Sequence, residues 1–446
     1  MTAILTIVLA AGEGTRMKSS TPKVLHKVGG LPMLGHVVSS CRAAGADRLA
    51  VILGPEHQES GAYLRALDPQ IKTATQTQRL GTAHATMQAR EYWTDFDGYV
   101  FVLFADNPMI QAQTIEQAKA VLDGGADLVV VGYEPQSPFG LGRLVMDGDQ
   151  LVRIVEEKDA SPAEKVIGFC NSGIMGFKVG CLRAVIDEIG NNNAQGEFYL
   201  TDAAEIARNK NFVVKTSTSP EDEVLGVNDR SQLAAAEATF QTRKRHEAMI
   251  NGVTLIAPET VFFSYDTFIE NDVTIEPNVV FGPGVTIKTG ATIHAFSHLE
   301  GATVGEGAQI GPYARLRPGA NMGMNSKAGN FVEIKKANIG KGAKINHLTY
   351  IGDAEIGAGT NVGAGTITCN YDGKNKYKTT IGENAFIGSN SSLVAPVTIQ
   401  DGAYVASGSV VDHDVEKDAL AIGRSKQINK SGYAIIIRQR WADKKD

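Results

Sequence analysis

Cysteine is scarce in this sequence, and no two cysteines have the CxxC spacing of a zinc site. The four that occur, Cys41, Cys170, Cys181 and Cys369, are scattered, so we expect buried thiols in a reducing compartment and no disulfide framework. An apolar run of bilayer-spanning length is also missing. Residues 1–10 are apolar but short and lack a basic lead-in, which indicates a buried strand and not a signal peptide. We therefore expect a cytoplasmic protein without a membrane span.

An excess of positive charge is missing as well. The chain carries 43 Lys and Arg against 49 Asp and Glu, a formal net charge of -6, so nucleic acid is not expected as a partner. Its 446 residues exceed what one hydrophobic core usually organises, which predicts at least two domains.

Apolar runs alternate with helical stretches up to about residue 228. Runs such as 4–9, 49–53 and 99–104 have the length of buried strands. This alternation predicts a Rossmann-like α/β domain with a largely parallel sheet over residues 1–228. Residues 229–250 predict a helical linker, with Ser231 as its N-cap and Asn251-Gly252 as its stop.

Beyond residue 266 an apolar residue returns every six positions, and glycine follows many of them. The first series is Ile269, Ile275, Phe281, Ile287, Ile293 and Leu299, and after short slips the period continues to Val411. This period fits a parallel β-helix, in which short strands turn corners and stack apolar residues inward, whereas an ordinary sandwich would show it only by coincidence. We predict a β-helix domain over residues 251–446 that includes a C-terminal arm. Its slips and an insertion at 368–380 mark residues 325–376 as a candidate site.

A glycine-rich turn follows the first strand, in Leu9–Met17. A dinucleotide fingerprint and a Walker loop both need glycine where Met17 stands, so neither is predicted. The turn still exposes backbone N–H groups, and Arg16 and Lys23 could hold a triphosphate and neutralise a leaving pyrophosphate. The alternative is an ordinary turn with surface cations.

An acidic residue, Asp106, stands just beyond the strand 99–104. Ligands meet α/β sheets at strand ends, and Mg²⁺ prefers oxygen donors, so Asp106 is a candidate magnesium ligand. A turn-forming aspartate before Asn107-Pro108 is the alternative.

Polar residues gather in the middle of the repeat region. Arg317, Lys335, Tyr350 and Lys376 would form one anion pocket if stacked coils point them the same way, and a solvated basic face is the alternative. His347 is the side chain of this group suited to accept a proton from an amine near neutral pH, although a lone histidine is often structural.

The first half resembles the sugar nucleotidylyltransferases in Leu9–Met17 with Pro22-Lys23. It is similar to N-acetylglucosamine-1-phosphate uridylyltransferases in segments 76–82, 142–143, 156–159, 171–173 and 191–197. The resemblance implies that Leu9, Ala10, Ala11 and Gly12 bind substrate; that Gln76, Gly81 and Thr82 read uracil; that Gly142, Glu156, Asn171, Tyr199 and Thr201 hold the sugar phosphate; and that Asp106 and Asn228 bind magnesium. Phe104-Ala105 replaces the Tyr-Gly of many relatives, so we expect a missing hydroxyl and an added methyl beside the nucleotide to alter affinity.

The second half resembles hexapeptide-repeat acyltransferases, whose coil is a left-handed parallel β-helix. Segments 315–318, 329–333, 341–350 and 363–373 are similar to the glucosamine-1-phosphate acetyltransferase half of a bifunctional family. The resemblance implies that His347 is the general base; that Arg317, Lys335, Tyr350, Asn361 and Lys376 bind the sugar phosphate; and that Ala364, Asn370, Tyr371, Ser389, Ser407 and Arg424 line the acetyl-CoA groove. It also implies a homotrimer.

The sequence therefore predicts a bifunctional enzyme. It would transfer acetyl from acetyl-CoA to glucosamine-1-phosphate, and then uridylyl from UTP to N-acetylglucosamine-1-phosphate with release of pyrophosphate, with Mg²⁺ as cofactor. Two alternatives stay open. One is a single-activity nucleotidyltransferase whose β-helix is a structural or trimerising module, and the other is a non-catalytic scaffold or sugar-nucleotide sensor.

Overall fold

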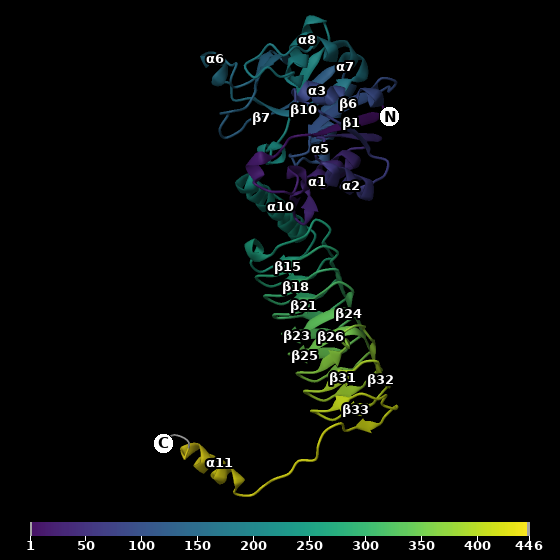
Figure 1. Ribbon diagram of the computed structural model, residues 1–446. Helices are drawn as coiled ribbons and strands as arrows, with labels where there is room; N and C mark the ends of the chain where they lie inside the picture. The colour runs from purple at the N-terminus through teal and green to yellow at the C-terminus, as the bar shows by residue number, and fades with distance from the viewer. Residues whose placement is uncertain (1, 444–446) are drawn as a thin grey trace. The chain divides into compact units, whose positions relative to one another are not determined.

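A computed structural model describes residues 2–443. Residue 1 of the predicted α/β domain and residues 444–446 of the predicted β-helix domain lie outside the described residues. The chain forms two compact units, Met1–Lys244 and Arg245–Asp446 (Figure 1). The division falls inside helix α10 (Arg230–Ile250), which belongs to the segment predicted as a linker. No helix among residues 2–443 is long and apolar enough to cross a bilayer.

The first unit is built on a mixed, largely parallel sheet. Its central order is β11 (Val214–Thr218), β7 (Leu128–Tyr133), β10 (Cys170–Lys178), β6 (Tyr99–Phe104), β1 (Ile4–Ala10), β4 (Arg48–Leu53) and β5 (Lys72–Thr75). β1 pairs in parallel with β4 and β6, while β10 runs antiparallel to β6 and β7. A hairpin of β8 (Arg143–Asp147) and β9 (Gln150–Val155) extends from β10. The predicted parallel α/β architecture is confirmed.

Helices pack on both faces of this sheet. Alternate residues of each strand point to opposite faces, and each face has its own hydrophobic core. On β1, Leu5 and Ile7 belong to one core and Ile4 and Val8 to the other. The helices over the first core are α3 (Thr82–Met87), α7 (Val179–Val185) and α8 (Ala203–Asn209), and those over the second are α1 (Met33–Ala43), α2 (Gln58–Leu67) and α5 (Ala112–Asp123). Shorter elements of this unit are η1 (Thr15–Met17), η2 (Lys23–Leu25), β2 (Lys27–Val28), β3 (Leu31–Pro32), α4 (Arg90–Trp93), α6 (Pro162–Lys165), η3 (Ile186–Glu188), η4 (Leu200–Asp202) and α9 (Glu221–Val224).

Helix α10 begins one residue before the expected cap. The Asp229 carboxylate accepts the backbone N–H of Gln232 at 2.9 Å, so Asp229 satisfies a free N–H of the first turn and the prediction of Ser231 as N-cap is wrong. The predicted stop at Asn251-Gly252 is confirmed, because the helix ends at Ile250 and Gly252 has a φ of 88°. Phe240 of the helix packs into a small core of the first unit.

The second unit is the predicted parallel β-helix (Figure 1). One sheet stacks β12 (Thr254–Leu255), β14 (Thr274–Ile275), β17 (Thr292–Ile293), β20 (Gln309–Ile310), β23 (Lys327–Asn330), β25 (Lys344–His347), β27 (Asn361–Val362), β30 (Phe386–Ile387), β33 (Tyr404–Val405) and β35 (Leu420–Ala421). The second sheet stacks β13 (Phe268–Ile269), β16 (Thr286–Ile287), β19 (Ala302–Val304), β22 (Ala320–Met322), β24 (Glu333–Ile339), β26 (Tyr350–Ile356), β28 (Ile367–Cys369), β31 (Ser392–Val394) and β34 (Val410–Val411). It also includes β15 (Val280–Phe281), β18 (His298–Leu299), β21 (Arg315–Leu316), β29 (Thr379–Ile381) and β32 (Val397–Ile399).

The apolar period supplies the core of this stack. Ile275, Ile287 and Ile293 are fully buried, and Phe268 pairs with Thr286 of the next coil in parallel register. The insertion leaves the coil between β28 and β29. After the last coil the chain is exposed and forms α11 (Tyr433–Ala442). All four cysteines are free; three are buried, as expected, and Cys369 is partly exposed.

Candidate active sites

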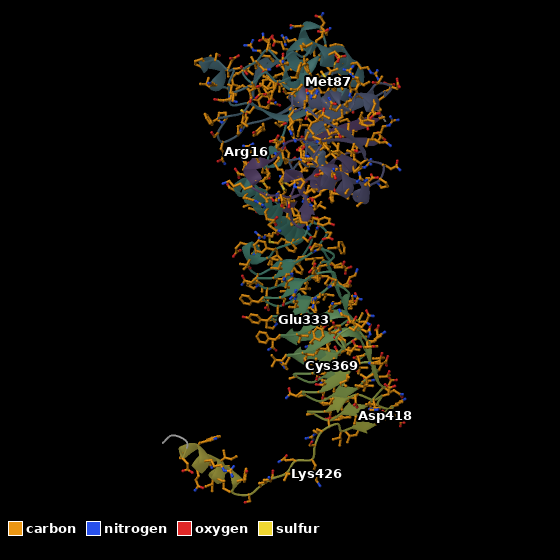
Figure 2. All side chains as sticks on the ribbon, in the orientation of Figure 1. Arg16, Met87, Glu333, Cys369, Asp418 and Lys426 are labelled. Atoms are coloured by element: carbon orange, nitrogen blue, oxygen red, sulfur yellow. The ribbon has the colours of Figure 1, made fainter. Side chains whose placement is uncertain are left out.

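A cleft of about 220 Å³ opens at the carboxyl ends of β1 and β6. Predicted site residues supply most of its lining: Leu9, Ala10, Ala11, Gly12, Lys23, Gln76, Gly81, Thr82 and Asp106. Phe104, Arg79 and Glu197 lie there too. Arg16 does not line the cleft; it is exposed on η1, at the surface of its unit (Figure 2).

The glycine-rich turn fixes the position of Lys23. Gly14 has a φ of 67°, and a Cβ there would lie 2.6 Å from the Cβ of Lys23, so the turn packs directly on the lysine stem. Only glycine adopts this conformation at low cost and allows the contact.

Three predicted residues from distant segments meet at the end of this stem. The Lys23 ammonium donates to Asp106 Oδ2 at 2.5 Å and to Asn228 Oδ1 at 3.2 Å. The side chains of Lys23 and Asp106 are only 11% and 21% exposed. Two oxygen donors of the kind that Mg²⁺ prefers thus already face one cation. No group of three or more His, Cys, Asp or Glu side chains arranged for a metal occurs within residues 2–443, so substrate oxygens and water would have to complete a magnesium shell here.

The predicted base-reading residues form a fixed hydrogen-bond arrangement. Gln76 is buried, and its amide nitrogen lies 3.1 Å from the carbonyl oxygen of Gly81 and 3.1 Å from His84 Nδ1. A Cβ on Gly81 would lie 2.5 Å from the carbonyl oxygen of Phe198, so that position requires glycine. With its nitrogen engaged, Gln76 presents its carbonyl oxygen as the free acceptor.

The predicted sugar residues lie at two places: Gly142, Glu156 and Asn171 at β8, β9 and β10, and Tyr199 and Thr201 at η4. Gly142 accepts from the backbone N–H of Asn171 at 2.8 Å, and Thr201 donates to Glu156 at 3.4 Å. Tyr199 accepts from Gln195 at 2.6 Å. Burial raises the pKa of Glu156. The structure thus pairs Gly142 with Asn171 and Glu156 with Thr201. The polar groups of these residues are of the kinds that bind the hydroxyl or amide groups of a sugar.

An ion pair that the sequence did not reveal supports this hairpin. Arg143 is buried; it pairs with Glu157 at 2.6 Å and also donates to the carbonyl oxygen of Leu141. Arg79 similarly links the base-reading segment to the turn, because it donates to the Ala11 carbonyl oxygen at 2.7 Å and pairs with Glu13. Both arginines lie inside motifs quoted above, but only the fold shows what they contact.

The structure places Phe104 and Ala105 in different surroundings. Ala105 is fully buried in one core of the first unit, so its methyl lies among apolar side chains and does not line the cleft. Phe104 does line the cleft, and its ring lies against Gly173, where a Cβ would be 2.3 Å from the ring. Any change in affinity should therefore come from Phe104.

Asp202 gives the first unit a pH-dependent stability. Burial, with smaller contributions from Glu205 and Asp159, raises the pKa of Asp202 to about 6. A carboxyl in the unfolded chain titrates near pH 3.9, so the folded protein holds this proton more tightly and stability falls as pH rises from about 4 to about 6. Asp202→Asn should remove that loss and stabilise the protein at pH 7 by about 1–2 kcal/mol, less than the full pKa shift would give because solvent screens this partly exposed carboxyl, with little effect near pH 4. Thermal unfolding at several pH values measures the difference; equal midpoints at pH 7 would contradict it.

The β-helix brings its predicted cations together. The ammonium of Lys376 lowers the pKa of Lys335, with a further contribution from Arg317. Arg317 pairs with Glu333, labelled in Figure 2, at 2.7 Å, and Tyr350 lies next to Glu333 in the ladder. Cations that face each other in this way suit a phosphate group.

His347 ends β25 and has a partner that the sequence did not reveal. Its Nδ1 lies 2.6 Å from Asn330 Oδ1, one coil below. Because a carboxamide oxygen only accepts, the hydrogen of the ring lies on Nδ1, and Nε2 keeps a free lone pair. Asn361 lies in register with Lys344 of the same strand as His347. This arrangement suits a general base.

Residues predicted for the acetyl-CoA groove follow one another along the stack. The backbone N–H of Asn390, next to Ser389, donates to the carbonyl oxygen of Ala364, and that of Gly408, next to Ser407, donates to Ser389. A Cβ on Gly408 would lie 3.8 Å from Arg424, so the series continues to that residue. Nearer the insertion, Asn370 is buried and donates to Asp353 at 2.5 Å, whereas Tyr371 is exposed. Such a row suits an elongated ligand.

Comparison with known proteins accounts for both units. Residues 6–164 match the family described as a MobA-like NTP transferase domain, and residues 266–301 and 378–413 match the bacterial transferase hexapeptide family, consistent with a left-handed β-helix. "Bifunctional protein GlmU" of Brucella canis is 57% identical over 98% of this chain and 96% of its own length. The proteins of that name from Azorhizobium caulinodans and Sinorhizobium medicae are 53% and 52% identical over 98% and 99% of this chain, and 97% of their own length in both cases. The chain therefore belongs to the family of bifunctional GlmU proteins.

Proposed function

We propose that the two sites catalyse successive steps in the synthesis of UDP-N-acetylglucosamine. The β-helix site transfers acetyl from acetyl-CoA to glucosamine-1-phosphate, and the cleft of the first unit transfers uridylyl from UTP to the product. Membership of a bifunctional family, together with two polar sites in separate units of one chain, supports this assignment. A purely structural β-helix would not need the partnered His347 or the facing cations Lys335 and Lys376.

Acetyl transfer proceeds by direct attack. Arg317, Lys335 and Lys376 hold the phosphate of the sugar, with Tyr350 and Asn361 as further contacts. His347 Nε2 takes a proton from the amine as its nitrogen attacks the thioester carbonyl. The C–S bond then breaks, and the CoA sulfur leaves and is protonated. Asn330 keeps the ring of His347 oriented throughout. Because the amine itself attacks the thioester, no protein nucleophile and no acyl-enzyme are required.

Uridylyl transfer depends on positioning and charge. A phosphate oxygen of N-acetylglucosamine-1-phosphate attacks the α-phosphorus of UTP, and the bond to pyrophosphate breaks. The free carbonyl oxygen of Gln76 accepts the N3–H of uracil, which cytosine lacks, so Gln76 favours uridine. Lys23, which lines the cleft, neutralises charge on the leaving pyrophosphate, and Arg16, exposed on η1, adds a second positive charge from the glycine-rich turn.

Asp106 and Asn228 are the residues that would hold Mg²⁺. The chemistry that Mg²⁺ supplies when bound is neutralisation of charge on the triphosphate and on the departing pyrophosphate. Asp106 provides a carboxylate and Asn228 an amide oxygen, which lie close enough to share one cation.

A cytoplasmic homotrimer completes the proposal. Phe296, Tyr313 and Phe331 stack on one another outside the coil and are each about half exposed. A row of exposed aromatic rings of this kind is suited to cover by a neighbouring subunit.

The direct test follows both products from one mixture. The purified full chain is incubated with glucosamine-1-phosphate, acetyl-CoA, UTP and magnesium, and free CoA thiol and pyrophosphate are measured while each cosubstrate is left out in turn. We expect both products, with pyrophosphate release dependent on acetylation. Pyrophosphate from N-acetylglucosamine-1-phosphate without any CoA release from glucosamine-1-phosphate would reduce the β-helix to a structural role.

A further inference from the structure

The ammonium of Lys23 contacts both side-chain oxygens that the proposed metal site uses, one from Asp106 and one from Asn228. Its ammonium contacts Asp106 Oδ2 at 2.5 Å and Asn228 Oδ1 at 3.2 Å. Its stem is held at the Cβ by the close approach of Gly14, while the rest of the side chain lies along the cleft. Lys23 therefore has an anchored base and a movable end.

A divalent cation and this ammonium cannot share the same oxygens. Mg²⁺ binds oxygen at about 2.0–2.1 Å, so a metal bound to Asp106 and Asn228 would come within contact distance of the Lys23 nitrogen. Repulsion between the two cations is strong here, because the side chains of Lys23 and Asp106 are mostly shielded from water. One cation has to leave when the other arrives.

We propose that Lys23 is the resident counter-ion of Asp106 and Asn228, and that metal enters this site together with the nucleotide, whose phosphates draw the ammonium away. The flexible end of the side chain then turns toward the phosphates beside the glycine-rich turn, which lines the same cleft. Lys23 thus changes partners from carboxylate to phosphate while the metal replaces it at Asp106. This inference rests on the proposed uridylyl-transfer site.

The exchange couples the two ligands. Metal alone must displace a bound ammonium without compensation, whereas metal with a triphosphate supplies the lysine with a new partner. Each ligand therefore raises the affinity for the other by the same factor. Removing the charge of Lys23 should remove the competition, so metal should bind more tightly to the nucleotide-free protein and depend less on nucleotide.

Mn²⁺ binding to the full chain tests this without catalysis. Free Mn²⁺ is titrated by electron paramagnetic resonance with wild type, Lys23→Met and Lys23→Arg, each with and without α,β-methylene-UTP, a non-cleavable analogue. Without nucleotide, Lys23→Met should bind Mn²⁺ about 5- to 150-fold more tightly than wild type, which is the usual range of coupling between sites. Lys23→Arg keeps the charge and should resemble wild type.

Controls separate this idea from the proposed function. Lys27→Met makes the same change at an exposed lysine and should bind Mn²⁺ as wild type does. Asp106→Asn, introduced into Lys23→Met, should abolish the tighter binding. If Lys23→Met without nucleotide binds Mn²⁺ no better than wild type, while wild type with the analogue does bind it, the exchange is wrong and the metal site stands. If protein-dependent Mn²⁺ binding is missing in every arm, the proposed metal site fails, and the exchange fails with it.

Discussion

Replacing His347 with alanine should lower acetyl transfer by about 10²–10⁴-fold, the usual contribution of a general acid or base. His347 Nε2 is free to accept a proton because Nδ1 is held 2.6 Å from Asn330. Uridylyl transfer from N-acetylglucosamine-1-phosphate should be unchanged, because the cleft is formed by residues of the other unit. The measurement is the rate of CoA thiol release at saturating substrates, beside the rate of pyrophosphate release.

His298→Ala is the matched control, since it removes an exposed histidine from β18 of the same β-helix. It should leave both rates as they are. Acetyl transfer within a few-fold of wild type in a correctly folded His347→Ala protein would exclude His347 as the base.

Replacing Asp106 with asparagine should lower uridylyl transfer by at least about 10²-fold, the scale of losing one electrostatic contact to the reacting groups. The substitution keeps the size of the side chain and removes its charge. It should also release Lys23, whose ammonium donates to Asp106 Oδ2. Acetyl transfer should be unaffected. Pyrophosphate release over a range of Mg²⁺ concentrations tests this, and higher Mg²⁺ should restore only part of the rate.

Asp97→Asn supplies the comparison, because Asp97 is exposed just before β6 and the same chemical change there should be silent. Loss of both activities in a stably folded Asp106→Asn protein would show that the two sites do not act separately.

The fold could be predicted from local patterns. The β-helix follows from one apolar residue in every six, such as Ile275 and Ile287, because these are the side chains that face the interior. The parallel sheet follows from runs such as 4–9 that are apolar on both faces, as expected where helices cover both sides. The cap of α10 was missed because Asp229 and Ser231 are both good caps, and sequence alone does not choose between them.

The chemistry at the sites could be predicted only in part. Contacts such as His347 with Asn330 depend on a coil length of 17 residues, which slips in the repeat conceal. Lys23 and Asn228 are 205 residues apart, and only the sheet order brings them together. The pair Arg143–Glu157 joins β8 to the segment just after β9, and nothing in the residue types distinguishes a buried arginine from a solvated one.

The regular ladder of the β-helix also determines which changes of length the chain can tolerate. Phe268 pairs with Thr286, so one complete coil there takes 286 − 268 = 18 residues. Deleting a whole coil before residue 302 would shorten the stack but leave every later side chain on its own face, including His347 and Lys335. Deleting only the six residues that separate one inward position from the next, for example Ile269 from Ile275, would move every later side chain to a different face of the β-helix. Evolution can therefore lengthen or shorten this domain in units of a full coil, whereas smaller insertions survive only as loops that leave the stack, as residues 370–378 do.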